Sequence, residues 1–230
     1  MARMHTCEAL VLKAYDIGEA DRFCILLTDT KGRVPVRAKG ARKAGSKCGS
    51  AIQSFQHLMI DISEHSSGLY LKSAKCLESY PCIREDIEKF TYASRASELL
   101  LHFLHDTEPG YSIFSLTKEY FQCCDYGISH VLFQTFELML LKELGVLPSF
   151  SDKKSQEIFG IKNASLELKT YLCSDLKIKE RMNMVLSDKD KLMLSSLCDL
   201  LLEDHLSFPL KSVVVSGALS CEISSAQRWS

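Results

Sequence analysis

The first 80 residues alternate hydrophobic and polar positions in short runs, a pattern that is typical of half-buried β-strands. Turn signals such as TKG and SEHSSG separate these runs. The predicted strands are residues 7–15, 22–29, 33–39, 52–62 and 69–80. Five short strands in about eighty residues predict an OB-like barrel, a fold that commonly binds oligonucleotides.

Two of these runs indicate which side chains face the core. In RVPVRAK, Val34, Val36 and Ala38 share one face, basic residues share the other, and Pro35 suits an edge strand or a bulge. In IQSFQHLMIDI, the even positions form the better core face. Phe55 is therefore expected to point away from the core, where an exposed ring could stack on a base of a nucleic acid.

After residue 80 the hydrophobic pattern changes from a period of 2 to a period of 3.6, which predicts helices. The predicted helices are residues 85–105, 112–127, 130–145 and 187–206. The third is apolar around most of its circumference, which predicts a central position in a bundle. The last has a leucine stripe formed by Leu192, Leu197, Leu200 and Leu201.

Residues 149–186 are polar with short apolar groups, which predicts short helices and loops, and KSVVVSG near the end suits a strand or an extended tail. The fold class is therefore α+β. We expect a five-stranded OB-fold domain at residues 1–80 and an all-α helical domain at residues 81–230.

The net charge of the chain is only −1, but its basic residues are unevenly distributed. Residues 1–80 carry twelve Lys and Arg against eight Asp and Glu, and residues 31–47 hold seven basic side chains and no acidic one. These seven are Lys31, Arg33, Arg37, Lys39, Arg42, Lys43 and Lys47. Beside a barrel, such a run favours binding of nucleic-acid phosphates with little sequence preference. A solvated surface without a ligand is the alternative.

Candidate catalytic and metal-binding groups are weak. Ten cysteines are scattered along the chain, and no C-x-x-C pair occurs. Glu98, His102 and His105 share one face of a predicted helix but lack a fourth ligand. Cys124 and His130 are the nearest nucleophile and base in the sequence, but they lie in apolar helical segments without a glycine-rich turn. We expect no metal, no cofactor and no enzymatic activity.

The chain has no apolar run of about 18 residues or more, and its first residues lack the pattern of a signal peptide. We therefore expect a cytoplasmic protein without a membrane partner.

Residues 8–43 resemble the N-terminal OB domain of the family of the bacterial recombination mediator RecO. The strand ALVLK, the turns GEADR and KGR, and the loop AKGARK occur in the order found in that family. The helical half resembles the family in layout, with KELGVLP and EDHLSFPLKS as weaker landmarks. Many members carry a four-cysteine zinc module after the central helix. Here the corresponding segment holds only Cys173, so no zinc site is expected.

The resemblance implies a bacterial DNA repair and recombination protein of the RecF pathway, associated with the nucleoid when it acts. Such a protein binds single- and double-stranded DNA and anneals complementary strands without ATP. It acts with RecR to help load RecA onto DNA coated by single-stranded DNA-binding protein, whose C-terminal tail binds the helical domain. The DNA-binding positions of the family carry over to Arg33, Arg37 and Lys39, and more loosely to Arg42 and Lys43.

Two other functions fit the same residues. The chain could be an OB-type module that binds RNA, or a helical adaptor whose basic loop docks on an acidic protein. Pairing of complementary DNA strands distinguishes a recombination mediator from an adaptor.

Overall fold

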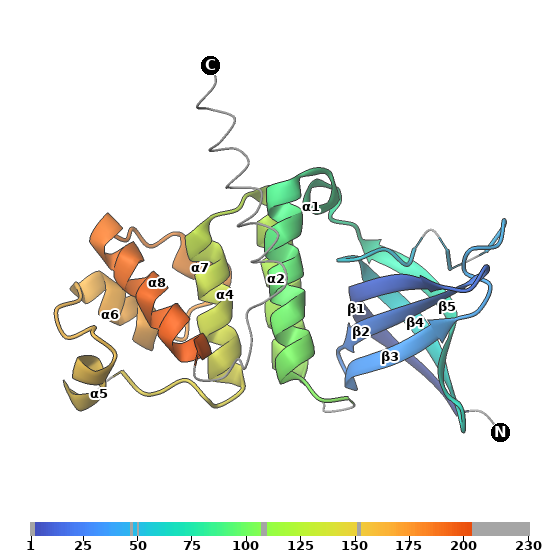
Figure 1. The fold of residues 1–230 in the computed structure, drawn as a ribbon, viewed down its shortest axis with the longest axis horizontal. Helices are drawn as coiled ribbons and strands as arrows, with labels where there is room; N and C mark the ends of the chain where they lie inside the picture. Colours follow the sequence, from blue (N-terminus) through green and yellow to red (C-terminus); the bar gives the residue numbers. More distant parts are fainter. Residues whose placement is uncertain (1–2, 47, 50, 107–109, 151–152, 204–230) are drawn as a thin grey trace, which may run out of the picture. The chain divides into compact units, whose positions relative to one another are not determined.

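The first part of the chain folds into a closed barrel of five strands. The computed structural model describes residues 3–46, 48–49, 51–106, 110–150 and 153–203. The strands are β1 (Arg3–Ile17), β2 (Asp21–Thr28), β3 (Gly32–Ala38), β4 (His57–His65) and β5 (Gly68–Glu78). They close in the order β1-β2-β3-β5-β4, with β3 and β5 parallel and the other neighbours antiparallel (Figure 1). The predicted α+β class and the five-stranded barrel are confirmed.

The barrel interior follows the faces predicted from the sequence. Val34, Val36 and Ala38 of β3 are buried in it, together with even-numbered residues of β4. Pro35 pairs with β2, at a point where β3 has no pair in β5, because β3 and β5 pair only at Val36 and Arg37. A proline, which lacks an N–H, is tolerated where the ladder to one neighbouring strand is interrupted.

A β-bulge in β1 decides which of its side chains face outward. The register between β1 and β2 shifts between Val11 and Lys13. Val11, before the shift, belongs to the core inside the barrel. Ala14, after the shift, packs against the same core. Lys13 and Tyr15 consequently lie on the outer surface of the barrel.

Three helices follow the barrel: α1 (Pro81–Glu85), α2 (Ile87–Phe103) and α3 (Tyr111–Tyr126). The α2 helix begins after Asp86. The Asp86 carboxylate caps the helix by accepting hydrogen bonds from the backbone N–H groups of Glu88 and Lys89 in its first turn. The α2 helix contacts β1. Side chains that point out of the barrel on this side are buried, including Leu10 and Leu27. One part of the outer barrel surface is therefore a second apolar core, packed against helices.

Phe55 belongs to this second core, so the expectation of an exposed stacking platform is wrong. Its side chain is only 2% exposed, and its ring lies edge-on to Phe90 and Phe121, with ring centroids 5.3 and 5.5 Å away. The sequence pattern correctly placed Phe55 outside the barrel. It did not show that helices from a later segment cover this side.

His57 is buried on the same side. Its Nε2 atom lies 2.8 Å from a carboxylate oxygen of Glu8, and its ring lies 5.9 Å from that of Phe114. Burial lowers the pKa of His57, and the nearby ammonium of Lys118 lowers it further, while Glu8 acts in the opposite direction.

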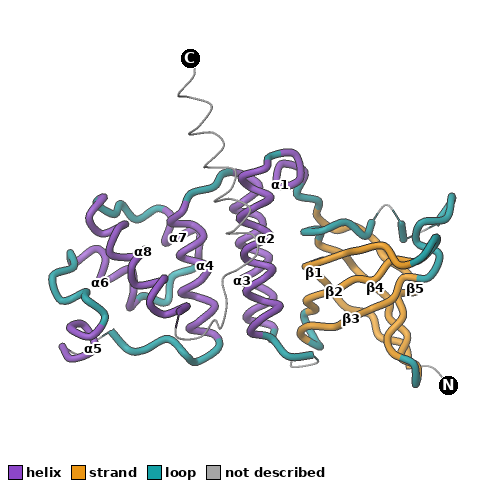
Figure 2. The backbone as a smooth tube through the Cα atoms, viewed as in Figure 1, coloured by secondary structure: helices purple, strands orange, loops and turns teal. Residues whose placement is uncertain are grey.

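The helices after α3 form a separate group: α4 (His130–Glu143), α5 (Lys153–Ile158), α6 (Leu166–Cys173), α7 (Ile178–Met182) and α8 (Asp188–Glu203). Most of α4 is buried, and it packs against α7 and α8, as a central helix should. Short helices and loops fill residues 153–182, as expected (Figure 2). The predicted leucine stripe is only half right, because Leu197 and Leu201 are buried whereas Leu192 and Leu200 are exposed. The segment KSVVVSG lies outside the described residues.

The chain divides into two compact units, residues 1–125 and 126–230. The change from strands to helices falls near residue 80, but α1, α2 and most of α3 group with the barrel. The division into a domain of residues 1–80 and a domain of residues 81–230 stays a prediction. No described helix combines the length and the apolar character that crossing a lipid bilayer requires.

Candidate nucleic-acid interface

The basic run of residues 31–47 meets carboxylates that come from other parts of the barrel unit. No acidic residue interrupts the run in the sequence, but folding brings four of its six described members into ion pairs. The pairs are Lys31–Glu64 at 3.8 Å, Arg33–Asp106 at 2.7 Å, Arg37–Asp21 at 2.8 Å and Arg42–Asp16 at 3.2 Å. The run is therefore not a uniform positive track, and Lys47 lies outside the described residues.

The Arg33 side chain is held by groups of the protein itself. Its guanidinium donates to the Asp106 carboxylate and, at 2.5 Å, to the backbone carbonyl oxygen of Leu101 near the end of α2. The side chain is 21% exposed. These contacts tie the start of β3 to α2 on the covered side of the barrel. Arg37 lies near the other end of the strand.

Arg37 lies on the open surface. Its guanidinium donates to Asp21, and Asp21 also accepts the backbone N–H of Gly40 at 2.8 Å. That N–H is the main cause of the lowered pKa of Asp21, with the hydrogen bond from Arg37 adding to it. Gly40 has a φ of +67°, which an L side chain rarely adopts. Because Asp21 binds both Gly40 and Arg37, it fixes the start of the loop after β3 and also holds the guanidinium in one position.

The remaining basic residues of the loop differ in their freedom. Arg42 pairs with Asp16 and donates to the carbonyl oxygen of Gly18, which ties it to the turn between β1 and β2. Lys43 is exposed. Within the described part of the chain, no carboxylate lies within ion-pair distance of Lys39 or Lys43. The ammonium groups of these two lysines are therefore not neutralised by a carboxylate of the described residues.

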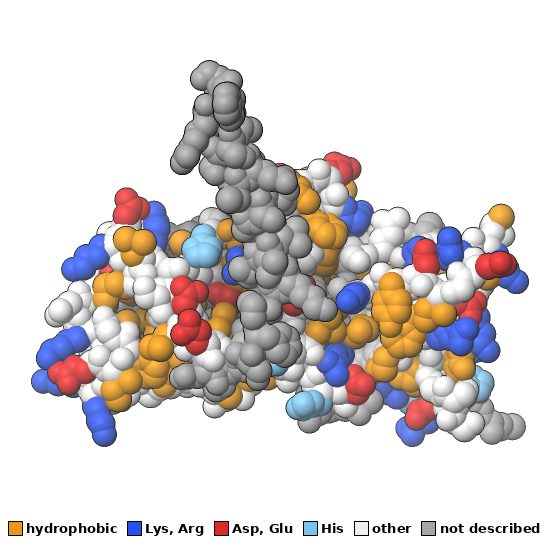
Figure 3. All heavy atoms as spheres, viewed as in Figure 1, with side chains coloured by type: hydrophobic (Ala, Val, Ile, Leu, Met, Phe, Trp, Pro, Cys, Tyr) orange, Lys and Arg blue, Asp and Glu red, His pale blue; other side chains and the backbone are white. Residues whose placement is uncertain are grey.

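A row of outward side chains crosses four neighbouring strands on the open side of the barrel. Tyr15 of β1 is paired with Phe23 of β2, Phe23 with Arg37 of β3, and Arg37 with Tyr70 of β5. The rings of Tyr15 and Phe23 lie 5.3 Å apart, and Tyr15 is 45% exposed. Hydrophobic side chains gather over these strands beside lysine and arginine side chains (Figure 3). Three aromatic rings and one guanidinium are thus presented to solvent together.

This row was missed in the sequence because it depends on the pairing of strands. Cys24 and Leu26 point into the barrel, and Phe23 lies on the other face of the same strand. Alternation alone would therefore have placed Phe23 on the outer surface of the barrel. Tyr15 is exposed only because the bulge reverses the alternation of β1. Tyr70 joins the row through the short parallel pairing of β3 and β5, between segments 33 residues apart in the chain.

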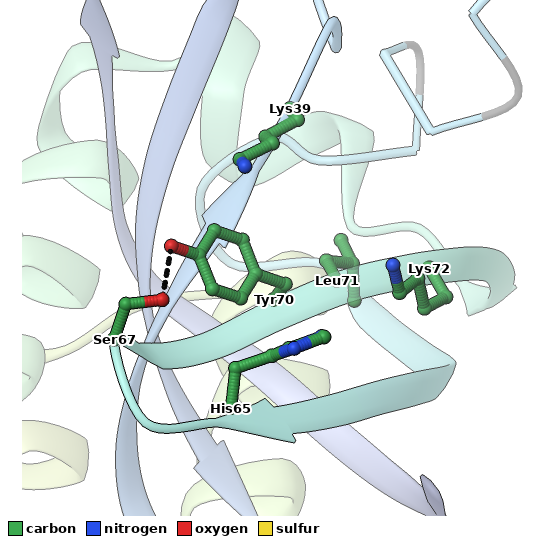
Figure 4. A pocket seen from close by; sticks show the side chains of 6 residues that line it. All are labelled: Lys39, His65, Ser67, Tyr70, Leu71 and Lys72. Atoms are coloured by element: carbon green, nitrogen blue, oxygen red, sulfur yellow. Dashed lines mark hydrogen bonds between the residues drawn. The ribbon is translucent and has the colours of Figure 1, made fainter. Parts of the chain in front are cut away.

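A small pocket lies at the β5 end of the row (Figure 4). Its volume is about 170 Å³. The ammonium of Lys39 lies 4.6 Å from the centre of the Tyr70 ring, a cation–π contact. The Tyr70 hydroxyl and the Ser67 hydroxyl are hydrogen-bonded at 3.0 Å. The pocket is lined by Lys39, His65, Ser67, Tyr70, Leu71 and Lys72.

The candidate nucleophile is not arranged for chemistry. Cys124 is fully buried in α3, and burial raises the pKa of its thiol to about 12. The thiolate form is therefore scarce near neutral pH. Among the described residues, no three side chains of His, Cys, Asp or Glu gather closely enough to hold a metal ion, and Glu98, His102 and His105 form no such group.

Comparisons with known proteins point to one family. A family model described as recombination protein O N terminal matches residues 1–80, and one described as recombination protein O C terminal matches residues 84–176. The chain is 27% identical to a DNA repair protein RecO of Exiguobacterium sp., over 88% of this chain and 91% of that protein. It is 32% identical to a DNA repair protein RecO of Anaeromyxobacter sp. strain K, over 60% of this chain and 56% of that protein. A DNA repair protein RecO of Myxococcus xanthus is 33% identical, with coverages of 62% and 59%.

Proposed function

The chain belongs to the recombination protein O family, a family of DNA repair and recombination, and from this premise we propose that its barrel binds single-stranded DNA across β1, β2, β3 and β5. The observation that carries the proposal is the row formed by Tyr15, Phe23, Arg37 and Tyr70. OB folds commonly bind oligonucleotides on the face that includes strands 2 and 3, and two members of the row lie there.

The row supplies the two interactions that single-stranded DNA needs. Aromatic rings stack on bases without reading their identity, each stack being worth about 1–3 kcal/mol. Arg37 adds a planar cation between the rings of Phe23 and Tyr70. Stacking on exposed rings requires unpaired bases, so this face favours single strands over duplex DNA.

Cations beside the row supply phosphate contacts. Lys13 lies on the outer face of β1, and Lys39 and Lys43 follow β3. Arg37 keeps donor groups free while it is paired with Asp21, because the guanidinium has five N–H donors. Arg33 is not included among the DNA contacts, because its guanidinium is engaged by Asp106 and Leu101.

We extend the proposal to the activities that the family resemblance implies: annealing of complementary strands without ATP, and action with RecR in loading RecA. A face that neutralises phosphates reduces the repulsion between two strands, which is what annealing needs. For the acidic C-terminal tail of single-stranded DNA-binding protein, the second unit offers a largely apolar cavity of about 320 Å³. It is lined by Lys142, Leu147, Pro148, Ser149, Phe150, Leu172 and Cys173.

The first test is a titration of fluorescently labelled single-stranded DNA with the full chain, followed by anisotropy at two salt concentrations. Phe23→Ala and Tyr70→Ala are each expected to lower affinity about 5- to 150-fold, the range that the loss of one stacked base implies. Lys75→Gln is the control, since Lys75 is exposed on β5 and pairs in register with Met59, outside the row. Unchanged affinity in folded Phe23→Ala and Tyr70→Ala variants would refute the assignment of this face.

The second test separates the proposed function from its alternatives. Complementary DNA strands coated with single-stranded DNA-binding protein should pair in the presence of the chain and without ATP, as followed by fluorescence energy transfer. A matched pair of RNA strands distinguishes an RNA-binding module, and absence of pairing with intact binding to an acidic protein would favour an adaptor.

A further inference from the structure

The pocket at the end of the row combines donors in a way that suits a doubly charged phosphate. Lys39 and Lys72 both line it, and within the described residues no carboxylate lies within ion-pair distance of either ammonium. The Ser67 and Tyr70 hydroxyls and the imidazole of His65 add hydrogen-bonding groups. Figure 4 shows Lys39 reaching over Tyr70 from the loop after β3, while Ser67 comes from the turn between β4 and β5 and His65 ends β4.

The size and charge of the pocket favour a phosphate at the end of a strand. A phosphodiester within DNA carries one negative charge, whereas a terminal phosphate ester carries about 1.5–2 charges near pH 7 and has three strong acceptor oxygens. Lys39 and Lys72 place two positive charges on the lining of the pocket, which favours the larger charge. The volume of about 170 Å³ is large enough for one such group.

The surface beyond the pocket disfavours continuation of the strand. The next strand in the barrel is β4, where Ser63 is paired with Tyr70 and Glu64 with Leu69. Glu64 is exposed. Asp61 lies nearby on the same strand, and hydrogen bonds from the hydroxyls of Ser73 and Thr6 lower its pKa, which keeps it ionised. Phosphates that pass β5 would meet the Asp61 carboxylate.

We propose that the pocket lined by Lys39, His65, Ser67, Tyr70 and Lys72 binds the terminal phosphate of a DNA strand that lies along the row. This inference rests on the proposed function. The strand then has one defined end on the barrel, at β5, and its other nucleotides run across β3, β2 and β1. The pocket accepts a phosphate at the 5′ or the 3′ end, and the experiment determines which.

The experiment compares oligonucleotides of one sequence that carry an internal fluorophore and differ only at their ends. One has a 5′ phosphate, one has a 3′ phosphate, and one has hydroxyl groups at both ends. A fourth is one nucleotide longer with hydroxyl ends, which adds a phosphate charge without a terminal phosphate ester. We expect one phosphorylated oligonucleotide to bind the full chain about tenfold more tightly than the two with hydroxyl ends, the factor typical of an added hydrogen bond to a charged group.

Variants locate the effect. Lys72→Gln and Lys39→Gln are each expected to remove most of the preference for the phosphorylated end. Tyr70→Phe keeps the ring and removes the hydroxyl, so it should weaken the preference for the phosphorylated end. Lys75→Gln, the same change at an exposed lysine of the same strand outside the pocket, should leave the preference intact.

Each outcome decides between the two proposals. Equal affinity for phosphate and hydroxyl ends overturns the pocket assignment and leaves binding along the row standing. A preference that persists in both Lys39→Gln and Lys72→Gln also overturns the pocket. Absence of binding to every oligonucleotide overturns the proposed function and this inference together.

Discussion

Replacement of Phe55 by alanine should lower the free energy of unfolding of the barrel unit and leave its DNA affinity unchanged. Phe55 is 2% exposed, and it contacts the rings of Phe90 and Phe121 from two helices that pack on the barrel. Its backbone N–H also donates to the carbonyl oxygen of Val11 at 2.7 Å, beside the bulge of β1. The residue therefore joins the last turn before β4, the strand β1 and the helices.

The cost follows from these contacts. Truncation of a buried phenylalanine to alanine typically lowers the free energy of unfolding by about 3–5 kcal/mol. Two edge-to-face ring contacts, each worth about 0.5–1.5 kcal/mol beyond burial, favour the upper half of that range. Phe55 also has a φ of +68°, the left-handed region, where a side chain costs about 1–2 kcal/mol relative to glycine. Phe55→Gly should therefore be more stable than Phe55→Ala by about 1 kcal/mol, the reverse of the usual order.

Urea denaturation of the full chain, followed by far-UV circular dichroism, measures both differences. The matched control is Phe23→Ala, which removes the same side chain from the open surface. The loss of its cross-strand pair with Tyr15 should cost only about 0.2–1 kcal/mol. DNA titrations at a temperature where all variants are folded complete the comparison, with affinity lost in Phe23→Ala and retained in Phe55→Ala.

Two results would refute this reasoning. A Phe55→Ala variant that unfolds with a loss below about 1 kcal/mol would show that the ring is not packed between the barrel and the helices. A Phe55→Gly variant no more stable than Phe55→Ala would show that the left-handed backbone conformation is wrong.

Three further outcomes follow from the same contacts. Arg33→Gln should lower the free energy of unfolding by about 1–3 kcal/mol, as expected for a lost hydrogen bond to a charged group, and titrations should show unchanged DNA affinity. Arg37→Gln combined with Lys39→Gln should reduce the slope of log affinity against log salt by about 0.7 per lost single-strand phosphate contact, or about 0.9 on duplex DNA, and an unchanged slope would exclude both residues as contacts. His57 has a lowered pKa in the folded state, so the unfolded chain binds its proton first and stability falls as the pH drops below the ordinary value near 6.5. His57→Gln should make urea midpoints less sensitive to pH below that value, and an unaltered pH dependence would argue against burial of a neutral imidazole.

Much of the barrel could be predicted because its signals are local. Alternation places Val34, Val36 and Ala38 inside, and each strand carries this information in its own few residues. The helices after residue 80 follow from their apolar periodicity in the same way. Prediction was weaker where a helix is short or partly exposed, as the solvent-exposed Leu192 shows.

The candidate site could be predicted only in part. The sequence identified a basic run, but the carboxylates that neutralise Lys31, Arg33 and Arg42 come from distant positions and could not be assigned to it in advance. Phe55 was chosen as the stacking ring because it points out of the barrel, and it is the ring that helices cover.

The sequence by itself determined the alternating strands, the change to helices and the concentration of basic residues, since each depends on neighbours within a few positions. Only the tertiary structure decided which outward side chains stay open to solvent. Tyr15, Phe23, Arg37 and Tyr70 become one surface through a bulge and the closure of the barrel. Side-chain exposure depends on every segment that packs nearby, and charge is felt through space, so neither can be read from positions along the chain alone.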